Sequence, residues 1–271
     1  MTTASLPVDP YAEAAPAPPL RFLHRLNPLA KLVAPVPAMV LLVFVRDLAT
    51  PLAFLALAYA VVLVGARMTA RSAVMLFAVV PVLTAIMTAG FAAWTDPAGI
   101  GHDVVVLRIG DWALYGAAVR IGAATGLRLA AIIALGLIAG LTTTGPDLAR
   151  SLVQQLRVSY RVGYTAIAAF RFVPRFRREL EIIRQAHRVR GQTRGPIAAL
   201  GRGFGYVVPL LAGAIRHAER VALAMDARAF GAYPDRTERH QVPFRARDIT
   251  FVAVFLLVSA GLFAALYPWG L

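Results

Sequence analysis

Five stretches of this chain are apolar and nearly long enough to cross a lipid bilayer, and they limit the possible folds more than any other feature. A membrane-spanning helix needs about 20 mostly apolar residues, because the hydrocarbon core is about 30 Å thick and each helical residue rises about 1.5 Å. The sequence predicts spans at about 27–45, 51–66, 73–94, within 112–142, and at 249–269. We therefore expect an all-α integral membrane protein with about five transmembrane helices.

Composition agrees with lipid as the surrounding medium. Of the 271 residues, 59% are hydrophobic and only 15% are charged, whereas a soluble domain carries about 25% charged residues. The absence of cysteine excludes disulfides, thiolate metal sites and cysteine nucleophiles. Residues 1–20 are rich in Ala and Pro without an apolar core, so we expect a disordered cytoplasmic tail there.

Local signals add detail to the predicted spans. Asn27 followed by Pro28 is a helix-start sequence. Lys31, the single lysine, is expected to snorkel from the first turn towards water. Kinks are expected at Pro35, Pro37 and Pro81, and an interfacial anchor at Tyr267 and Trp269.

The distribution of charge predicts the orientation. Residues 145–248 contain 19 arginines and 8 acidic residues, a net charge of +11, while 95–111 hold three aspartates and one arginine. Cytoplasmic loops are enriched in Lys and Arg, so we expect the N-terminus and 145–248 in the cytoplasm of a multi-pass membrane protein. The predicted parts are a tail (1–20), a four-helix membrane domain (21–144), a cytoplasmic segment (145–248) and a last span (249–271).

The cytoplasmic segment is too long for a plain connection and shows two helical patterns. Apolar residues recur every three or four positions in two runs: Phe172, Phe176, Leu180 and Ile183, then Leu211, Ile215, Ala218, Ala222 and Met225. Each predicted amphipathic helix ends in an arginine among small residues. We call 189–191 the first arginine end and 227–231 the second arginine end.

An arginine at the end of a helix is well placed to bind a partner protein. Arginine in a last turn is favoured by the helix dipole, and its forked guanidinium can reach a carboxylate on another protein. A solvated helix end is the simpler interpretation of one such sequence. Two of them in one segment favour docking to a partner.

Four short segments relate the chain to a known family. They are Leu23-His24-Arg25-Leu26-Asn27-Pro28 with Lys31; Leu141-Thr142-Thr143-Thr144 with Pro146-Asp147-Leu148; the run from Gln185 to Gly191; and the run from Ala222 to Gly231. Together they resemble the transmembrane T component of energy-coupling factor (ECF) transporters, vitamin and metal importers related to cobalt-type permeases. The similarity covers roughly residues 20–270.

The resemblance implies a scaffold and coupling subunit in a bacterial inner membrane rather than an enzyme. In that family, two ATP-binding cassette subunits hold the arginine-bearing helices and drive a small substrate-binding membrane subunit. ATP and Mg are bound by the partners, so no cofactor is expected on this chain, and the cargo, a vitamin or a transition-metal ion, stays open. By this resemblance Arg190 and Arg228 would be the docking arginines, with Arg188, Gly191, Ala227 and Gly231 shaping the contact.

The chain departs from the family pattern at two positions. Val189 stands where the family usually has Ala, and Ala229 stands where it usually has Gly. We expect Gly231 to provide the helix stop that Ala229 cannot.

The sequence gives little support to the hypothesis that this chain is an enzyme. A P-loop needs a Gly-Lys-Ser/Thr sequence, and the single lysine lies in a Leu-Ala-Lys-Leu context. Asp226 and Asp235 are too few for the metal-binding aspartates of a membrane phosphatidyl transferase. The five histidines lack metal-ligand spacing, so neither a catalytic nor a metal site is expected.

A secondary transporter or channel is the main alternative. It would need ionisable groups along a path through the spans, and the candidates are Arg120 and Arg128. Arg128 is expected to make an intramembrane packing or polar contact, with Thr84 and Thr88 as candidate neighbours. Nucleic acid is not expected as a partner, because the arginines lack interleaved aromatic residues and suit anionic lipid or an acidic protein better.

Overall fold

The computed structural model describes residues 21–95, 105–109, 112–189, 196–234, 237–238 and 240–266. The chain forms two compact units. One unit comprises the chain up to Thr143 together with Pro243–Leu271, and we call it the apolar unit. The other is Thr144–Val242, the arginine-rich unit. The predicted tail 1–20 and the predicted anchor at Tyr267 and Trp269 lie outside the described residues.

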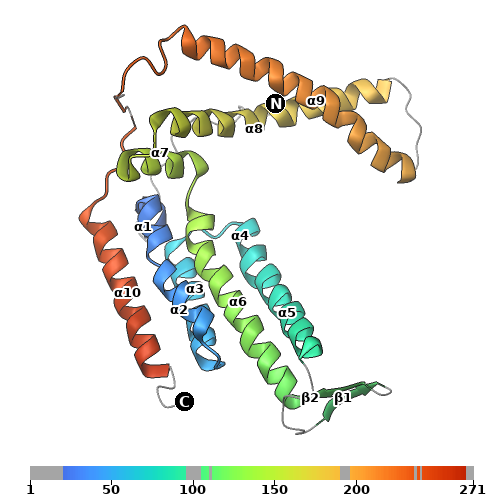
Figure 1. The fold of residues 1–271 in the computed structure, drawn as a ribbon, viewed down its shortest axis with the longest axis vertical. Helices are drawn as coiled ribbons and strands as arrows, with labels where there is room; N and C mark the ends of the chain where they lie inside the picture. Colours follow the sequence, from blue (N-terminus) through green and yellow to red (C-terminus); the bar gives the residue numbers. More distant parts are fainter. Residues whose placement is uncertain are drawn as a thin grey trace, which may run out of the picture. The chain divides into compact units, whose positions relative to one another are not determined.

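The described part of the apolar unit is built from helices and a small hairpin (Figure 1). Its elements are η1 Phe22–Arg25, α1 Pro28–Val33, α2 Val36–Phe44, α3 Ala49–Gly65, α4 Ala70–Val74, η2 Met75–Val79, α5 Val80–Trp94, β1 Val105–Ile109, β2 Trp112–Tyr115, α6 Gly116–Thr142 and α10 Ala246–Leu266.

Three helices of the described chain are long and apolar enough to cross a membrane. They are Ala70–Trp94, Gly116–Thr142 and Ala246–Leu266, and two shorter apolar helices cover Pro28–Phe44 and Ala49–Gly65. The predicted class, a helical membrane protein, is confirmed. The number of spans stays a prediction, because the two shorter helices fall below the length that a straight crossing requires.

The hairpin was not expected from the sequence. Strands β1 and β2 pair antiparallel, with Ile109 opposite Trp112, so the start of the predicted fourth span belongs to a strand. Residues 105–109 are rich in β-branched and apolar side chains, and Gly110-Asp111 between the strands is a hairpin-turn sequence. The helical part of this span begins at Gly116.

Proline and asparagine shape the first helix as predicted. The side chain of Asn27 accepts a hydrogen bond of 2.9 Å from the Leu29 amide, with Pro28 in the first turn. The helix is then interrupted at Pro35, where α1 gives way to α2. Proline removes a backbone donor and clashes with the preceding turn, which explains the interruption.

Lys31 does not snorkel, and that prediction was wrong. Its side chain is 2% exposed, and its Nζ donates a 2.8 Å hydrogen bond to the carbonyl of Thr142. The last carbonyls of a helix lack intrahelical partners and carry the negative end of the dipole, so the end of α6 attracts this ammonium group. Two of the four motif segments, 23–31 and 141–148, thus meet at this bond.

Asp248 ties two helix starts together within the apolar unit. It is fully buried, and its carboxylate accepts hydrogen bonds of 2.7 Å from the amides of Asn27 and Arg245. These amides lie at the starts of α1 and α10, where N–H groups have no partner within the helix. One carboxylate therefore caps both helices and fixes the last helix against the first.

Pro81 produces a π-helical turn in the third apolar helix. In this turn, Met75–Val79, the Val80 amide donates to the carbonyl of Met75, five residues earlier. The next bond of that pattern would run from residue 81 to Leu76, but proline has no amide hydrogen. The hydroxyl of Tyr59 donates to the free Leu76 carbonyl instead.

Glycine allows α5 and α6 to pack closely. A Cβ added at Gly122 would lie 2.5 Å from the Thr88 carbonyl oxygen and 2.7 Å from the Ala92 amide nitrogen. One added at Gly126 would collide with the Thr88 side chain. Small residues spaced by four, such as these, bring membrane helices into close van der Waals contact. We call this contact the glycine seam.

In its described residues the arginine-rich unit consists of three helices and, after α9, the segment 237–242, which we call the return segment. The helices are α7 Gly145–Leu156, α8 Tyr160–Val189 and α9 Pro196–Asp226. Thr144 caps α7 by accepting a bond of 3.3 Å from the Asp147 amide, and Arg150 pairs with Asp147 at 2.8 Å. Helices α8 and α9 are the two predicted amphipathic helices, and they cross and contact each other (Figure 1).

Candidate functional site

The contact between α8 and α9 is aromatic and basic. The ring of Phe172 meets the imidazole of His217 edge-on at 4.7 Å, and His187 meets Tyr206 at 5.1 Å. Burial, followed by the charges of Arg175 and Arg220, lowers the pKa of His217. The lowered pKa favours the neutral form of the imidazole in this contact.

The two predicted apolar faces differ in how much of their surface is exposed. On α8, Phe172, Phe176, Leu180 and Ile183 are all half-buried. On α9, Leu211 and Ile215 are 56% and 59% exposed. The residues of α9 that face α8 are instead Gly213 and His217. A Cβ added at Gly213 would lie 3.4 Å from the side chain of Glu179, and the His217 ring contacts Phe172. The α9 periodicity therefore predicted the helix but not the face that packs within this unit.

The second arginine end has the backbone of a Schellman motif. The Phe230 amide donates to the Met225 carbonyl at 3.0 Å, and the Ala229 amide donates to the Asp226 carbonyl at 2.9 Å. Ala229 itself takes the left-handed conformation, with φ of 54°. The expectation that Gly231 stops the helix was wrong: Ala229 closes it, and Gly231 (φ 92°) bends the chain again two residues later.

A glycine at position 229 should stabilise this end. An L-residue in the left-handed region costs roughly 1 kcal/mol, which glycine avoids. For Ala229→Gly we expect the amides of 227–230 to exchange about fivefold more slowly, which corresponds to about 1 kcal/mol. Ala224→Gly, within α9, is the matched control and should exchange faster. Unchanged exchange at 227–230 would show that the strain is absent.

The described residues of the predicted site are exposed or line a cavity. Arg228 lines a cavity of about 750 Å³ with Tyr160 and Phe230, and its guanidinium has no hydrogen bond or ion pair to any described residue. Arg188 is well exposed and pairs with Glu181 at 3.3 Å. Ala227 is exposed and continues the helical bonding by donating to Leu223. Arg190 and Gly191 lie outside the described residues.

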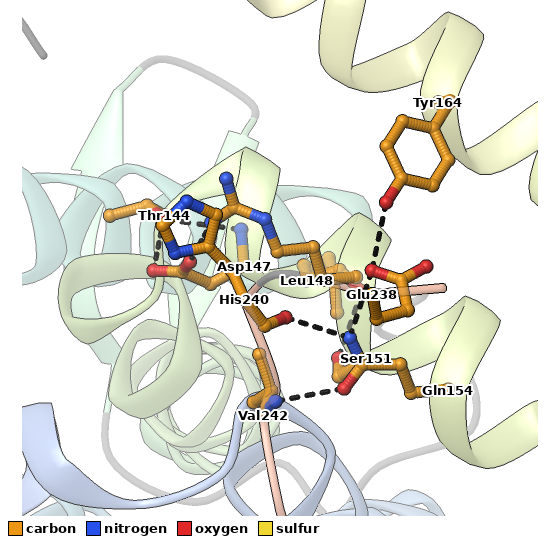
Figure 2. Close-up of polar contacts among 10 residues, drawn as sticks. Thr144, Asp147, Leu148, Ser151, Gln154, Tyr164, Glu238, His240 and Val242 are labelled. Atoms are coloured by element: carbon orange, nitrogen blue, oxygen red, sulfur yellow. Dashed lines mark hydrogen bonds and ion pairs between the residues drawn. The ribbon is translucent and has the colours of Figure 1, made fainter. Parts of the chain in front are cut away.

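Sequence reasoning missed the contacts that hold the return segment, residues 237–242 where described. The amide of Gln154 donates to the carbonyl of His240 at 2.9 Å, and its oxygen accepts from the Val242 amide at 2.8 Å (Figure 2). Tyr164 donates to Glu238 at 2.8 Å (Figure 2). A single glutamine in an amphipathic helix carries no distinctive signal, so these pairings could not be read from the sequence.

Arg128 lies in the apolar unit and binds a helix end. Its NH1 donates to the carbonyls of Val43 and Val45 at 3.1 and 3.0 Å, and NH2 reaches the Thr125 hydroxyl at 3.3 Å. These carbonyls terminate α2, where helical partners are missing. The hydroxyl of Thr84, a suggested neighbour, donates to Val80 instead. A structural cap accounts for this arginine without a transport path.

Metal-binding clusters are not found in the described ranges. No group of three or more His, Asp or Glu side chains there is placed to hold a metal ion.

The fold and the candidate site define a helical membrane protein that also contains an arginine-rich helical unit. Over residues 20–239 the sequence matches the cobalt transport protein family CbiQ, and the chain belongs to this family.

Curated relatives extend this assignment. The chain is 28% identical over 260 residues to the energy-coupling factor transporter transmembrane protein EcfT of Bacillus selenitireducens, covering 92% of this chain and 94% of that protein. It is 34% identical over 138 residues to EcfT of Limosilactobacillus fermentum (46% and 51%). A putative ABC transporter ATP-binding protein of Bifidobacterium longum is 28% identical over 253 residues, which is 89% of this chain but only 32% of that protein.

Proposed function

We propose that this chain is the membrane scaffold and coupling subunit of an ATP-driven importer of the energy-coupling factor type. The observation that carries the proposal is the second arginine end. Arg228 stands at the closed terminus of a long amphipathic helix, in a strongly basic unit, and pairs with no described residue. A charge in this setting suits an acidic surface on a partner protein.

Two ATP-binding subunits are the proposed partners. The chain has no Gly-Lys-Ser/Thr sequence for binding phosphate. We therefore assign ATP binding to the partners, although the name of the Bifidobacterium relative describes an ATP-binding protein. We place the arginine-rich unit in the cytoplasm with the N-terminus, since its net positive charge favours that side. Each arginine end would meet one ATP-binding subunit.

The proposed mechanism is mechanical. ATP binding draws the two partner subunits together, and helices α8 and α9 follow them through their arginine ends. The changed angle between these helices acts on a small substrate-binding membrane subunit, through apolar residues such as Leu211 and Ile215 that α8 leaves uncovered. The chain performs no covalent chemistry of its own in this scheme. Its cargo would be a vitamin or a transition-metal ion chosen by the small subunit.

Affinity purification of the intact chain from its native membrane tests this proposal. We expect two ATP-binding subunits and one small membrane protein to co-purify, with transport into vesicles only when all are present and ATP is supplied. Transport or catalysis by the purified chain alone would contradict the proposal and favour a secondary transporter, channel or membrane enzyme.

A further inference from the structure

Two adjacent residues at the start of α8 hold the chain just after Arg228, at the end of the second arginine end and directly beyond it. Arg161 donates a 2.6 Å hydrogen bond from NH2 to the carbonyl of Gly231. Tyr160 donates a 2.6 Å bond to the carbonyl of Tyr233, and its ring meets Phe230 edge-on at 5.8 Å. Three contacts from one helical turn therefore fall on residues 230–233.

The contacts from Tyr160 and Arg161 fall on a segment in which the backbone bends sharply. Ala229 and Gly231 both have positive φ, 54° and 92°, so the path after Arg228 is set by a short, tightly bent segment. The Schellman bonds fix only its beginning. The contacts from α8 fix its other side, since a guanidinium on a carbonyl makes a short, charge-assisted bond.

The direction of Arg228 depends on this bent segment. Its guanidinium has no hydrogen bond or ion pair among the described residues, so the backbone beside it determines where it points. Arg228 and Tyr160 line the same cavity of about 750 Å³. The start of α8 thus bounds the space in which the arginine moves.

We propose that Tyr160 and Arg161 are positioning residues that present Arg228 to the acidic surface of an ATP-binding subunit. This inference rests on the proposed function. Arg161 directs its charge at a backbone carbonyl and makes no ion pair with a described acidic residue. Its role is to hold the second arginine end in the conformation that binds the partner, so less ordering remains to be done on association.

The test measures the affinity of the full chain, in detergent, for its ATP-binding subunits. We expect Arg228→Ala to weaken binding about 100-fold, as loss of a buried charge pair does, and Arg161→Ala to weaken it about tenfold through lost preorganisation. Arg161→Lys, which keeps one donor, should recover affinity to within about threefold. Arg177→Ala, exposed elsewhere on α8, is the control and should bind normally.

A double-mutant cycle separates positioning from an independent contact. Arg161→Ala combined with Arg228→Ala should bind no more weakly than Arg228→Ala alone, at an unchanged thermal midpoint. Two outcomes would overturn the positioning role only. One is that the losses of affinity in the two single variants add in the double variant, and the other is that Arg161→Ala binds with full affinity while Arg228→Ala binds more weakly. Full affinity of Arg228→Ala would overturn the proposed function itself. If Arg161→Ala does not fold, Tyr160→Phe supplies the same test, because it removes the bond to Tyr233 and keeps the ring.

Discussion

Replacing Arg190 and Arg228 together with Glu is expected to abolish co-purification of the ATP-binding subunits. Truncating one partner of a buried, hydrogen-bonded charge pair typically costs about 2–5 kcal/mol, and reversal adds repulsion, so binding should fall more than about 100-fold. Single substitutions should give partial losses if each end meets a different subunit. The amount of ATP-binding subunit recovered per chain is the measurement.

The matched control reverses the same amount of charge within α8, away from both arginine ends. Arg177→Glu with Arg178→Glu changes two exposed arginines and leaves both arginine ends intact. Equal losses in the control and the test would assign the effect to net charge alone. An undiminished complex in the Arg190→Glu, Arg228→Glu variant would remove the docking role from both ends.

A methyl group in the glycine seam should damage the apolar unit severely. In Gly122→Ala the new Cβ would press on backbone atoms of Thr88 and Ala92, which cannot rotate away as a side chain can. Helices α5 and α6 must then separate, and overpacking of this kind costs about 1–3 kcal/mol. We expect a lower thermal midpoint in detergent and a lower yield of folded protein.

Gly140→Ala is the control for this prediction. A Cβ there meets no atom within 4 Å, and the residue lies in the same helix. Any gain in helix propensity from alanine is therefore similar at both positions. Equal stability of the two variants would contradict the close packing of the seam.

The sequence predicted best those features that depend on local periodicity. Most of the described part of the apolar runs is helical, as are the patterns around Phe172 and Leu211, and Asn27-Pro28 begins a helix. The interruption at Pro35 follows from the missing amide alone. Each of these features is decided by neighbours within one or two turns.

Features that depend on distant partners could not be predicted. Lys31 is buried because the end of α6 lies beside it, 111 positions later in the sequence. The pattern predicted an apolar face on α9 that includes Leu211 and Ile215, but it could not show that the unit turns another side of α9 towards α8. Ala229 takes the left-handed conformation although an L-residue disfavours it.

The candidate site was predicted from family motifs more than from chemistry. The sequence predicted that a helix ends near Arg228, and α9 ends at Asp226, but Tyr160 and Arg161, which contact the segment after Arg228, lie about 70 residues earlier in the chain. Nothing in their local sequence marks them. Their role in presenting Arg228 remains a proposal.

The cytoplasmic location of α8 and α9 is the condition on which the coupling account depends most directly. The chain contains no cysteine, so a single introduced thiol can be labelled without background. Glu219→Cys in α9 and Arg108→Cys in β1 both replace exposed residues. A membrane-impermeant maleimide applied to intact spheroplasts should label the Arg108→Cys variant and reach the Glu219→Cys variant only after permeabilisation. Labelling of the Glu219→Cys variant in intact spheroplasts would place α9 outside the cell, away from any ATP-binding subunit, and would contradict the account.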